Sequence, residues 1–246
     1  MRLPNLARRL ARRAYSATHH AGVRRTINGL DVRLSAHIAR GVPSTVTGDL
    51  LTKWLDLCRA AHLALDVGAN VGVWSALGAR VMQRGGTVFA MEPAPDAYEI
   101  LCDGARVHEG PGAIVPIHAA AGAAVGTLRF SLVDGPTATT NRVGGAGSIE
   151  VPARTIDSLE LAPEVIKMDV EGYELAVLRG AKQTLALRAA TVLLDLHWVP
   201  DYGATAGALI ELAAECGYEI RSAEQMAITA EAELLRQNSV ILRPAA

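Results

Sequence analysis

Residues 63–81 read LALDVGANVGVWSALGARV, and this stretch decides the fold. An apolar run ends at Asp66, then Gly68, Asn70 and Gly72 follow, and a helical pattern begins directly after them. A strand that passes through a glycine turn into a helix is typical of a doubly wound α/β sheet. Ligands of such sheets bind beyond the carboxyl ends of the strands. We therefore expect a ligand against this turn, where glycine leaves bare backbone.

The polar residues of the turn favour a cationic ligand. The G-x-G-x-x-G fingerprint of dinucleotide sites needs a glycine where this chain has Asn70. The carboxylate of Asp66 would repel a pyrophosphate, but it would attract the ammonium and sulfonium groups of S-adenosylmethionine. S-adenosylmethionine is therefore the expected cofactor. An NAD-dependent oxidoreductase is the alternative, and a non-catalytic protein that binds the cofactor is a third.

Short apolar runs recur along the chain, and helical patterns separate most of them. This alternation predicts an α/β fold with a mostly parallel sheet, covered by helices on both faces. The last two runs are close in sequence and predict a terminal antiparallel strand pair. The expected strands are 63–67, 87–91, 113–119, 165–170, 191–197, 218–222 and 239–243. The expected helices are 50–57, 73–84, 94–107, 172–187 and 204–216.

The connection between the third and fourth expected strands shows no clear crossover helix. Residues 127–135 indicate a hairpin, 136–148 are rich in Gly and Thr, and 149–155 resemble another strand. Long glycine-containing loops within a compact domain are usually functional. We expect residues 124–155 to lie near the site, as a lid or a substrate-facing element.

Acidic residues mark the ends of the later strands. Glu92 ends the second strand, 26 residues after Asp66, which is the spacing at which a carboxylate meets ribose hydroxyls. The stretch VIKMDVEGYELAVLRGA, residues 165–181, places Asp169 and Glu171 before a helix. A favourable position at the helix N-terminus accounts for Glu174, but it does not account for Asp169.

The fifth strand ends near Asp195 and His197, which share one phase of the strand alternation. His197 is a candidate general base for an alcohol, with Asp169 and Glu171 as the other candidates. An acidic cluster is also a way to hold a divalent cation. We predict no metal, because no further Asp, Asn or His lies close in the sequence.

Composition excludes several classes of protein. The 246 residues are 50% hydrophobic and 20% charged, which is a globular composition. Seven arginines and no acidic residue fall within residues 1–30. Subtracting these from the 24 basic residues leaves 17 against 25 acidic ones, so residues 31–246 carry a net charge of −8. An acidic body is a poor nucleic-acid binder, and we predict no nucleic-acid partner.

The N-terminal extension, residues 1–45, is predicted to be separate from the domain at 46–246. Its first residues combine arginines with an apolar helical stripe. Three interpretations remain open: a solvated leader helix, a peripheral contact with an anionic membrane or a partner, and a transit peptide. The three cysteines are widely spaced and odd in number, which indicates a reducing, cytoplasmic location. No transmembrane helix is predicted, and the oligomeric state is not encoded.

Four motifs together resemble the FkbM-type family of S-adenosylmethionine-dependent methyltransferases. They are LDVGANVG, VFAMEP, PARTIDSL and IKMDVEGYELAVLRGA, and they cover about residues 62–200 in the family's order. The resemblance implies a class I methyltransferase (Rossmann-like) fold. It also implies methyl transfer to a hydroxyl oxygen of a small molecule, sugar or glycolipid.

The resemblance also implies roles for particular positions. Glu92 would bind the ribose, and Ala119 and Ala120 would lie near the adenine. Asp169 and Glu171 fall on the family's acidic motif, and His197 on its late histidine position. The residues implied for the methionine half of the cofactor are Asp66, Gly68, Asn70 and Gly72.

Overall fold

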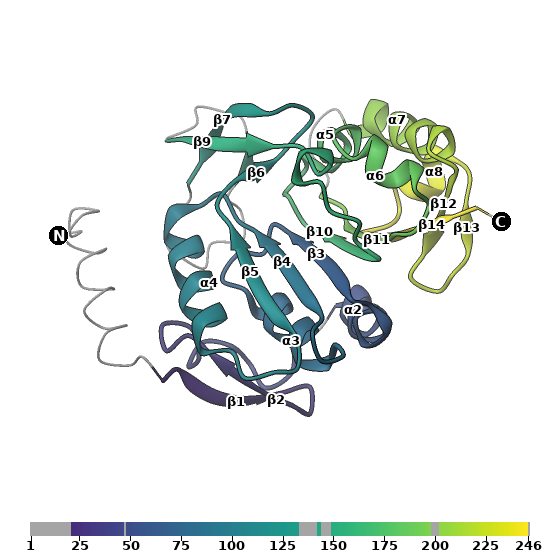
Figure 1. Cartoon of the computed structure of the whole chain (residues 1–246). Coiled ribbons are helices and arrows are strands. Elements are labelled where there is room, and N and C mark those ends of the chain that lie inside the picture. The colour runs from purple at the N-terminus through teal and green to yellow at the C-terminus, as the bar shows by residue number, and fades with distance from the viewer. Residues whose placement is uncertain (1–20, 47, 133–141, 144–148, 198–201, 246) are drawn as a thin grey trace.

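The computed structural model describes residues 21–46, 48–132, 142–143, 149–197 and 202–245. Its centre is an eight-stranded sheet with the order β13-β12-β14-β11-β10-β3-β4-β5 (Figure 1). The five strands from β11 to β5 run parallel. In chain order the strands of this sheet are β3 (Leu63–Val67), β4 (Thr87–Met91), β5 (Ala113–Ile117), β10 (Val165–Met168), β11 (Thr191–Asp195), β12 (Tyr218–Ser222), β13 (Ala227–Ile228) and β14 (Ser239–Pro244).

The two central strands are buried on both faces. Strand β10, with the sequence VIKM, is buried at all four positions, and β3 is buried from its second residue onward. Apolar side chains dominate both strands, as burial between two helix layers requires. The exceptions are Lys167 and Asp66, which are opposite each other in the register of the two strands. Two opposite charges therefore share the middle of the sheet.

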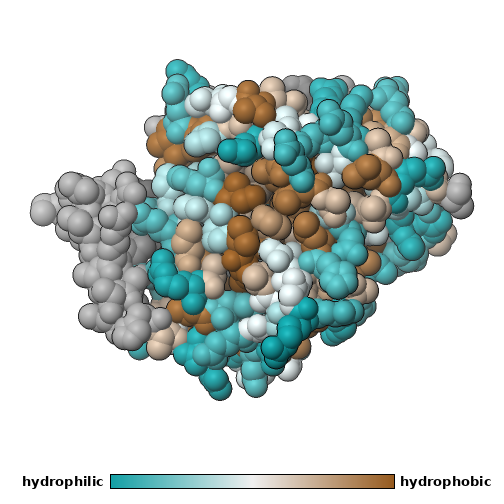
Figure 2. Space-filling view, viewed as in Figure 1, coloured by the Kyte–Doolittle hydropathy of each residue, from teal (hydrophilic) through white to brown (hydrophobic). Residues whose placement is uncertain are grey.

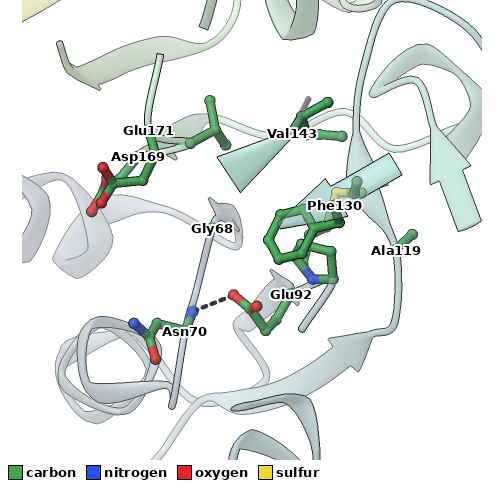
Figure 3. A pocket seen from close by; sticks show the side chains of 13 residues that line it. Gly68, Asn70, Glu92, Ala119, Phe130, Val143, Asp169 and Glu171 are labelled. Carbon is green, nitrogen blue, oxygen red and sulfur yellow. Dashed lines mark hydrogen bonds between the residues drawn. The ribbon is translucent and has the colours of Figure 1, made fainter. Parts of the chain in front are cut away.

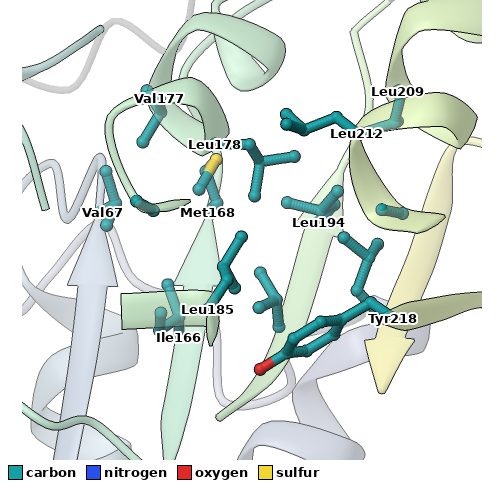
Figure 4. Packing of buried hydrophobic residues seen from close by; sticks show 14 of the residues in the cluster. Val67, Ile166, Met168, Val177, Leu178, Leu185, Leu194, Leu209, Leu212 and Tyr218 are labelled. Atoms are coloured by element: carbon teal, nitrogen blue, oxygen red, sulfur yellow. The ribbon is translucent and has the colours of Figure 1, made fainter. Parts of the chain in front are cut away.

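Helices cover the two faces of the sheet. On one side α2 (Asp49–Ala60) packs against α3 (Val73–Val81). The indole of Trp54 on α2 lies against Gly78 on α3, and a Cβ at Gly78 would meet it at 2.7 Å. Helix α4 (Pro95–Val107) lies beside β5. The other face carries α5 (Glu174–Arg179), α6 (Lys182–Ala186) and α7 (Tyr202–Glu215) (Figure 4). Their apolar contacts with β10 and β11 include Met168, Val177, Leu178, Leu185, Leu194, Leu209 and Leu212.

The expectation of one continuous helix over residues 172–187 is wrong. The structure has two short helices, α5 (Glu174–Arg179) and α6 (Lys182–Ala186), which are separated at Gly180. A Cβ at Gly180 would meet the carbonyl oxygen of Gly122 at 2.1 Å, and the Gly180 carbonyl accepts a hydrogen bond from Asp157. The break is therefore made by backbone that belongs to distant parts of the chain.

The predicted terminal antiparallel pair is confirmed. Strand β14 inserts between β11 and β12 and runs antiparallel to both. The short helix α8 (Glu231–Leu234) and strand β13 lie in the connection from β12 to β14. No helix among the described residues is long and apolar enough to cross a membrane.

A second sheet replaces the missing crossover helix between β5 and β10. Its order is β6-β9-β7-β8, from β6 (Ala120–Ala121), β7 (Gly126–Ser131), β8 (Arg142–Val143) and β9 (Ile149–Arg154). Strand β7 runs antiparallel to both β8 and β9. A 3₁₀ turn, η1 (Asp157–Leu159), then leads to β10.

Because a second sheet takes the place of a crossover helix here, one face of the edge strands β4 and β5 stays partly exposed. Figure 2 shows hydrophobic side chains gathered near the middle of the view, over the region where β4 and β5 lie in Figure 1. Phe89 and Val115 are register partners on these strands, and Val115 is 38% exposed. Ile117 and Phe89 are partly buried.

Part of the predicted N-terminal extension packs on the domain. The hairpin of β1 (Val23–Ile27) and β2 (Leu30–Leu34) shares an apolar cluster with α2 and α3. A domain boundary at residue 46 remains a prediction, and this packing favours a folded unit that begins at β1. The arginine-rich residues 1–20, with the three interpretations that they left open, lie outside the described residues.

Candidate active site

The glycine turn is fixed to the end of the neighbouring strand. The backbone N–H groups of Gly68 and Ala69 both donate to the carbonyl oxygen of Met91, at 3.0 and 2.9 Å. Gly68 has a φ of 77°, and a Cβ there would meet the carbonyl oxygen of Asp169 at 1.9 Å. Only glycine fits between these two backbones. Asn70 also has a left-handed φ, 49°, which asparagine tolerates better than most residues.

Glu92 is the buried carboxylate next to this turn. It is 5% exposed, and its two oxygens accept hydrogen bonds from the backbone N–H groups of Asn70 and Ala94, each at 2.8 Å (Figure 3). Burial raises the pKa of Glu92 to about 7, although both hydrogen bonds act to lower it. Each carboxylate oxygen keeps capacity to accept a further hydrogen bond, which suits two ribose hydroxyls.

A pocket lies at the carboxyl ends of the parallel strands, between the glycine turn and the second sheet (Figure 3). The second sheet contributes Phe130 and Val143 to its wall, which supports the expectation that residues 124–155 lie near the site. Most of the cofactor residues predicted from the sequence line this pocket. The lining residues are Gly68, Asn70, Met91, Glu92, Pro93, Ala119, Ala120, Ala121, Phe130, Val143, Asp169, Val170 and Glu171.

Two of the predicted cofactor residues do not line the pocket. Asp66 is fully buried beneath the turn, where it accepts a hydrogen bond from the Ser75 hydroxyl at 2.6 Å. Gly72, with a φ of 84°, lies against the side chain of Leu101, and a Cβ there would meet that side chain at 2.5 Å. Both residues therefore support the turn from its buried side, away from the pocket.

Lys167 connects Asp66 to the pocket, and the sequence analysis missed it. Its Nζ lies 3.4 Å from Asp66, 3.5 Å from Asp169 and 3.3 Å from the carbonyl oxygen of Gly68. Burial alone would lower the pKa of Lys167, but the two carboxylates raise it above its ordinary value. A lysine within a four-residue buried strand was the available signal, because such a charge needs partners.

The acidic motif and the late histidine come together as predicted. His197 lies 3.8 Å from Asp169, 3.6 Å from Glu171 and 3.5 Å from Glu174. The neighbouring carboxylates, Glu174 first and then Glu171 and Asp169, together raise the pKa of His197 to about 9 against the effect of burial. His197 is therefore a cation at neutral pH in this cluster of carboxylates.

The turn after β10 holds Glu171 in an unusual backbone conformation. Glu171 has a φ of 55° and Gly172 a φ of 96°. The N–H of Gly172 donates to Glu174 at 3.0 Å, which fixes Glu174 in this turn as well as at the start of α5. A left-handed backbone conformation costs free energy in residues other than glycine, and such residues concentrate at functional sites.

Burial raises the pKa of Glu171, although the charge of His197 acts to lower it.

A metal remains unassigned at this cluster. Among the described residues, Asp169, Asp195 and His197 can each direct one ligand atom to within 4.8 Å of the others. Each of the three already faces an opposite charge within the protein, because Lys167 faces Asp169, and His197 faces both Asp169 and Asp195. The absence of a metal stays a prediction.

The comparison with protein families decides the assignment. Residues 66–220 match the methyltransferase FkbM domain. The chain belongs to this family. The FkbM match begins at Asp66 and includes the glycine turn, Glu92, the second sheet and the acidic cluster, but it excludes the hairpin β1–β2 and α2.

One curated relative and several solved structures are similar to this FkbM chain. The hexuronic acid methyltransferase AglP of Haloferax volcanii is 29% identical over 157 residues, which are 61% of this chain and 62% of that protein. The chain thus spans less than two thirds of this relative. An FkbM methyltransferase from Methylobacillus flagellatus has a TM-score of 0.48 at 18% identity, covering 74% of this chain and 43% of that one. A Bacillus cereus O-methyltransferase in complex with SAH has a TM-score of 0.44 at 12% identity, covering 84% and 86%.

The FkbM site fits S-adenosylmethionine, the methyl donor of this class of enzyme. Glu92 presents a buried carboxylate that can accept further hydrogen bonds from hydroxyl groups such as those of a ribose, and the small side chains of Ala119, Ala120 and Ala121 leave room for a flat base. The net negative charge of the acidic cluster suits a ligand that carries a sulfonium.

Proposed function

We propose that this chain transfers the methyl group of S-adenosylmethionine to a hydroxyl oxygen of a sugar or a sugar-bearing molecule. One observation carries the proposal: the acidic cluster around His197 adjoins the pocket of Glu92, since Asp169 and Glu171 belong to both. Glu92, the proposed ribose-binding carboxylate, thus lines the same pocket as two members of the proposed proton-accepting cluster. The similarity to a hexuronic acid methyltransferase favours a sugar acceptor.

Bound S-adenosylmethionine supplies an electrophilic methyl carbon. With the acceptor oxygen as nucleophile and S-adenosylhomocysteine as the leaving group, a base of this chain would have to accept the hydroxyl proton. We assign this base to His197 in its neutral form. The positive charge of the bound cofactor opposes protonation of His197 and lowers its pKa from the value near 9.

Asp169 holds His197 in position and faces the cofactor. One of its carboxylate oxygens is 3.8 Å from His197 and the other is 3.5 Å from Lys167. This fixes the carboxylate between two cationic groups, at the edge of the sheet where the two halves of the site meet. Glu171, in the strained turn, faces the second ring nitrogen of His197.

The charges of the cluster favour a neutral acceptor group over a carboxylate. Asp169, Glu171, Glu174 and Asp195 surround one histidine, so an incoming carboxylate would meet repulsion. A carboxylate acceptor would also need no base, whereas a hydroxyl group does. We therefore propose methyl ether formation, on a hexuronic acid or another sugar, in preference to esterification.

The test is transfer of a labelled methyl group from S-adenosylmethionine to a panel of hexoses, hexuronic acids and glycolipids. We expect labelled product that survives mild alkali, because methyl ethers are stable there and methyl esters are hydrolysed. An alkali-labile product would overturn the hydroxyl assignment. Binding of adenosylhomocysteine with no turnover over the whole panel would favour a non-catalytic protein, and calorimetric binding of NAD would favour an oxidoreductase.

A further inference from the structure

A second cavity, of about 560 Å³, adjoins the cofactor pocket. The two share Gly68, Asn70 and Asp169, so they meet at the glycine turn. Pockets that enclose a whole small ligand have volumes of about 300–1,000 Å³. A cofactor that lies along the glycine turn fills only the part of the second cavity next to Gly68 and Asn70. The rest of the cavity therefore has room for a second ligand.

Part of the cavity wall comes from residues 37–46, which precede the family match. The hairpin β1–β2 holds this segment in place. The guanidinium of Arg25 donates to the carbonyl oxygen of Val42 at 2.8 Å, and the side-chain amide of Asn28 both donates to and accepts from the backbone of Val46, at 2.9 Å in each direction. The family match includes the glycine turn, the ribose carboxylate and the acidic cluster, but not this wall. A fixed wall outside the shared part of the site suits a ligand other than the shared cofactor.

Trp74 gives the cavity an aromatic surface. It lies at the start of α3, where its carbonyl oxygen accepts a hydrogen bond from the Trp54 indole at 3.0 Å. Its own indole N–H has no hydrogen-bond partner among the described residues. The hydroxyl of Thr45, which also lines the cavity, likewise has none within the part of the chain that the structure describes. An aromatic ring beside two available hydrogen-bonding groups matches a sugar, whose ring has apolar C–H faces and an edge of hydroxyls.

Asp169 joins the second cavity to the reacting groups. It lines both cavities, and one of its carboxylate oxygens lies 3.8 Å from His197. A hydroxyl group that reaches Asp169 from the second cavity is therefore next to the proposed base. We propose that this cavity binds the sugar of the acceptor between Trp74 and residues 42–46. One hydroxyl of that sugar then faces Asp169 and His197. The choice of a sugar as the ligand rests on the proposed function.

The test measures sugar binding without turnover. The full-length protein is saturated with S-adenosylhomocysteine, and saturation-transfer NMR titrations are recorded with methyl β-D-glucoside and methyl β-D-glucuronide, a neutral and an acidic sugar ring. Two variants alter the cavity from different sides: Val46→Trp fills it, and Trp74→Leu removes the aromatic surface. Ser44→Trp is the matched control, because Ser44 lies in the same segment as Val46, is exposed and does not line the cavity.

We expect saturation transfer to at least one of the two sugars in the wild type. Val46→Trp and Trp74→Leu should each weaken this binding by roughly tenfold or more. Calorimetry should show an adenosylhomocysteine affinity within about twofold of the wild type in both variants, and Ser44→Trp should leave both ligands within the same limit. If one of the two cavity variants lowers Tm, the other decides the result.

Three outcomes would overturn the proposal. They are no saturation transfer to either sugar in the wild type, unchanged sugar binding in the folded cavity variants, and an adenosylhomocysteine affinity that falls as far as the sugar affinity, which would assign the whole cavity to the cofactor. Failure of the proposed function has a different signature. If no sugar of the panel is methylated while sugar binding still depends on Val46, the methyl transfer to sugars is wrong and the sugar site stands.

Discussion

Lys167 and Asp66 are register partners on the two central strands, and their charged atoms lie 3.4 Å apart where the sheet is otherwise apolar. The pair also reaches the site, because the same ammonium group contacts Asp169 and the carbonyl of Gly68. The deepest part of the core and the wall of the cofactor pocket are therefore joined through one side chain.

Replacing Lys167 by Met should destabilise the fold and the site together. Asp66, which is fully buried, would lose its cationic partner, at a cost of about 3–5 kcal/mol in the free energy of unfolding. Denaturant unfolding measures this. In the double variant Lys167→Met with Asp66→Asn, the uncompensated charge is gone and more than half of the loss should be recovered. Additive losses in the double variant would contradict the pairing.

Gly68→Ala should abolish cofactor binding, because its Cβ would collide with the carbonyl oxygen of Asp169. Gly29→Ala is the control: Gly29 has a similar φ, 76°, but a Cβ there meets nothing within 4 Å. The control should cost about 1 kcal/mol of stability from backbone strain and leave binding unchanged. Calorimetry with adenosylhomocysteine and thermal unfolding check both, and wild-type affinity in Gly68→Ala would contradict the close approach.

Local patterns predicted β3 and β4 well, because Gly68 follows the first strand and Pro93 closely follows the second, and such residues favour the end of a strand. The helix expected over 172–187 failed for a different reason. The helix is interrupted at Gly180, where the backbone of Gly122 approaches. The sequence of residues 172–187 does not show that Gly122 lies there. The pairing of β7 with β9 likewise depends on a long connection, so the second sheet was not predictable from local pattern.

The sequence predicted the site residues that line the pocket better than those that hold the lining residues in place from the core. Glu92 and Asp169 line the pocket, as the strand-end position indicates. Asp66 is the last residue but one of β3, and its side chain points into the core toward Ser75. Its carboxylate therefore supports the turn from the buried side and does not face the pocket.

The affinity for adenosylhomocysteine should depend on pH through Glu92. The pKa of Glu92 is about 7, and in the proposed site the ribose hydroxyls donate to its ionised form. Binding therefore requires loss of a proton below that pH, so affinity should rise with pH through 7 and level off above it. Glu92→Gln should bind about 10–100-fold more weakly, since hydrogen bonds to a charged group are lost, and without this pH dependence. Calorimetry between pH 6 and about 8.5 would test this; a wild-type affinity that is flat over this range would exclude the role.

The rate of methyl transfer should rise with pH. His197 must be neutral to accept a proton, and bound cofactor lowers its pKa from about 9, so kcat/KM for the acceptor at saturating cofactor should increase with pH to a plateau, with its midpoint below about 9. His197→Gln should lower kcat by about 10²–10⁴-fold and change the affinity for adenosylhomocysteine by less than about twofold.

Glu174→Gln separates the role of His197 as a base from a structural role. The Gln side chain can still accept the hydrogen bond from Gly172, but it removes the charge next to His197 that most raises its pKa. The rise in kcat/KM should therefore shift to lower pH, with the fold intact by circular dichroism. A profile that keeps its midpoint in Glu174→Gln, or a His197→Gln enzyme with wild-type turnover, would remove His197 from the chemistry and leave Asp169 as the candidate base.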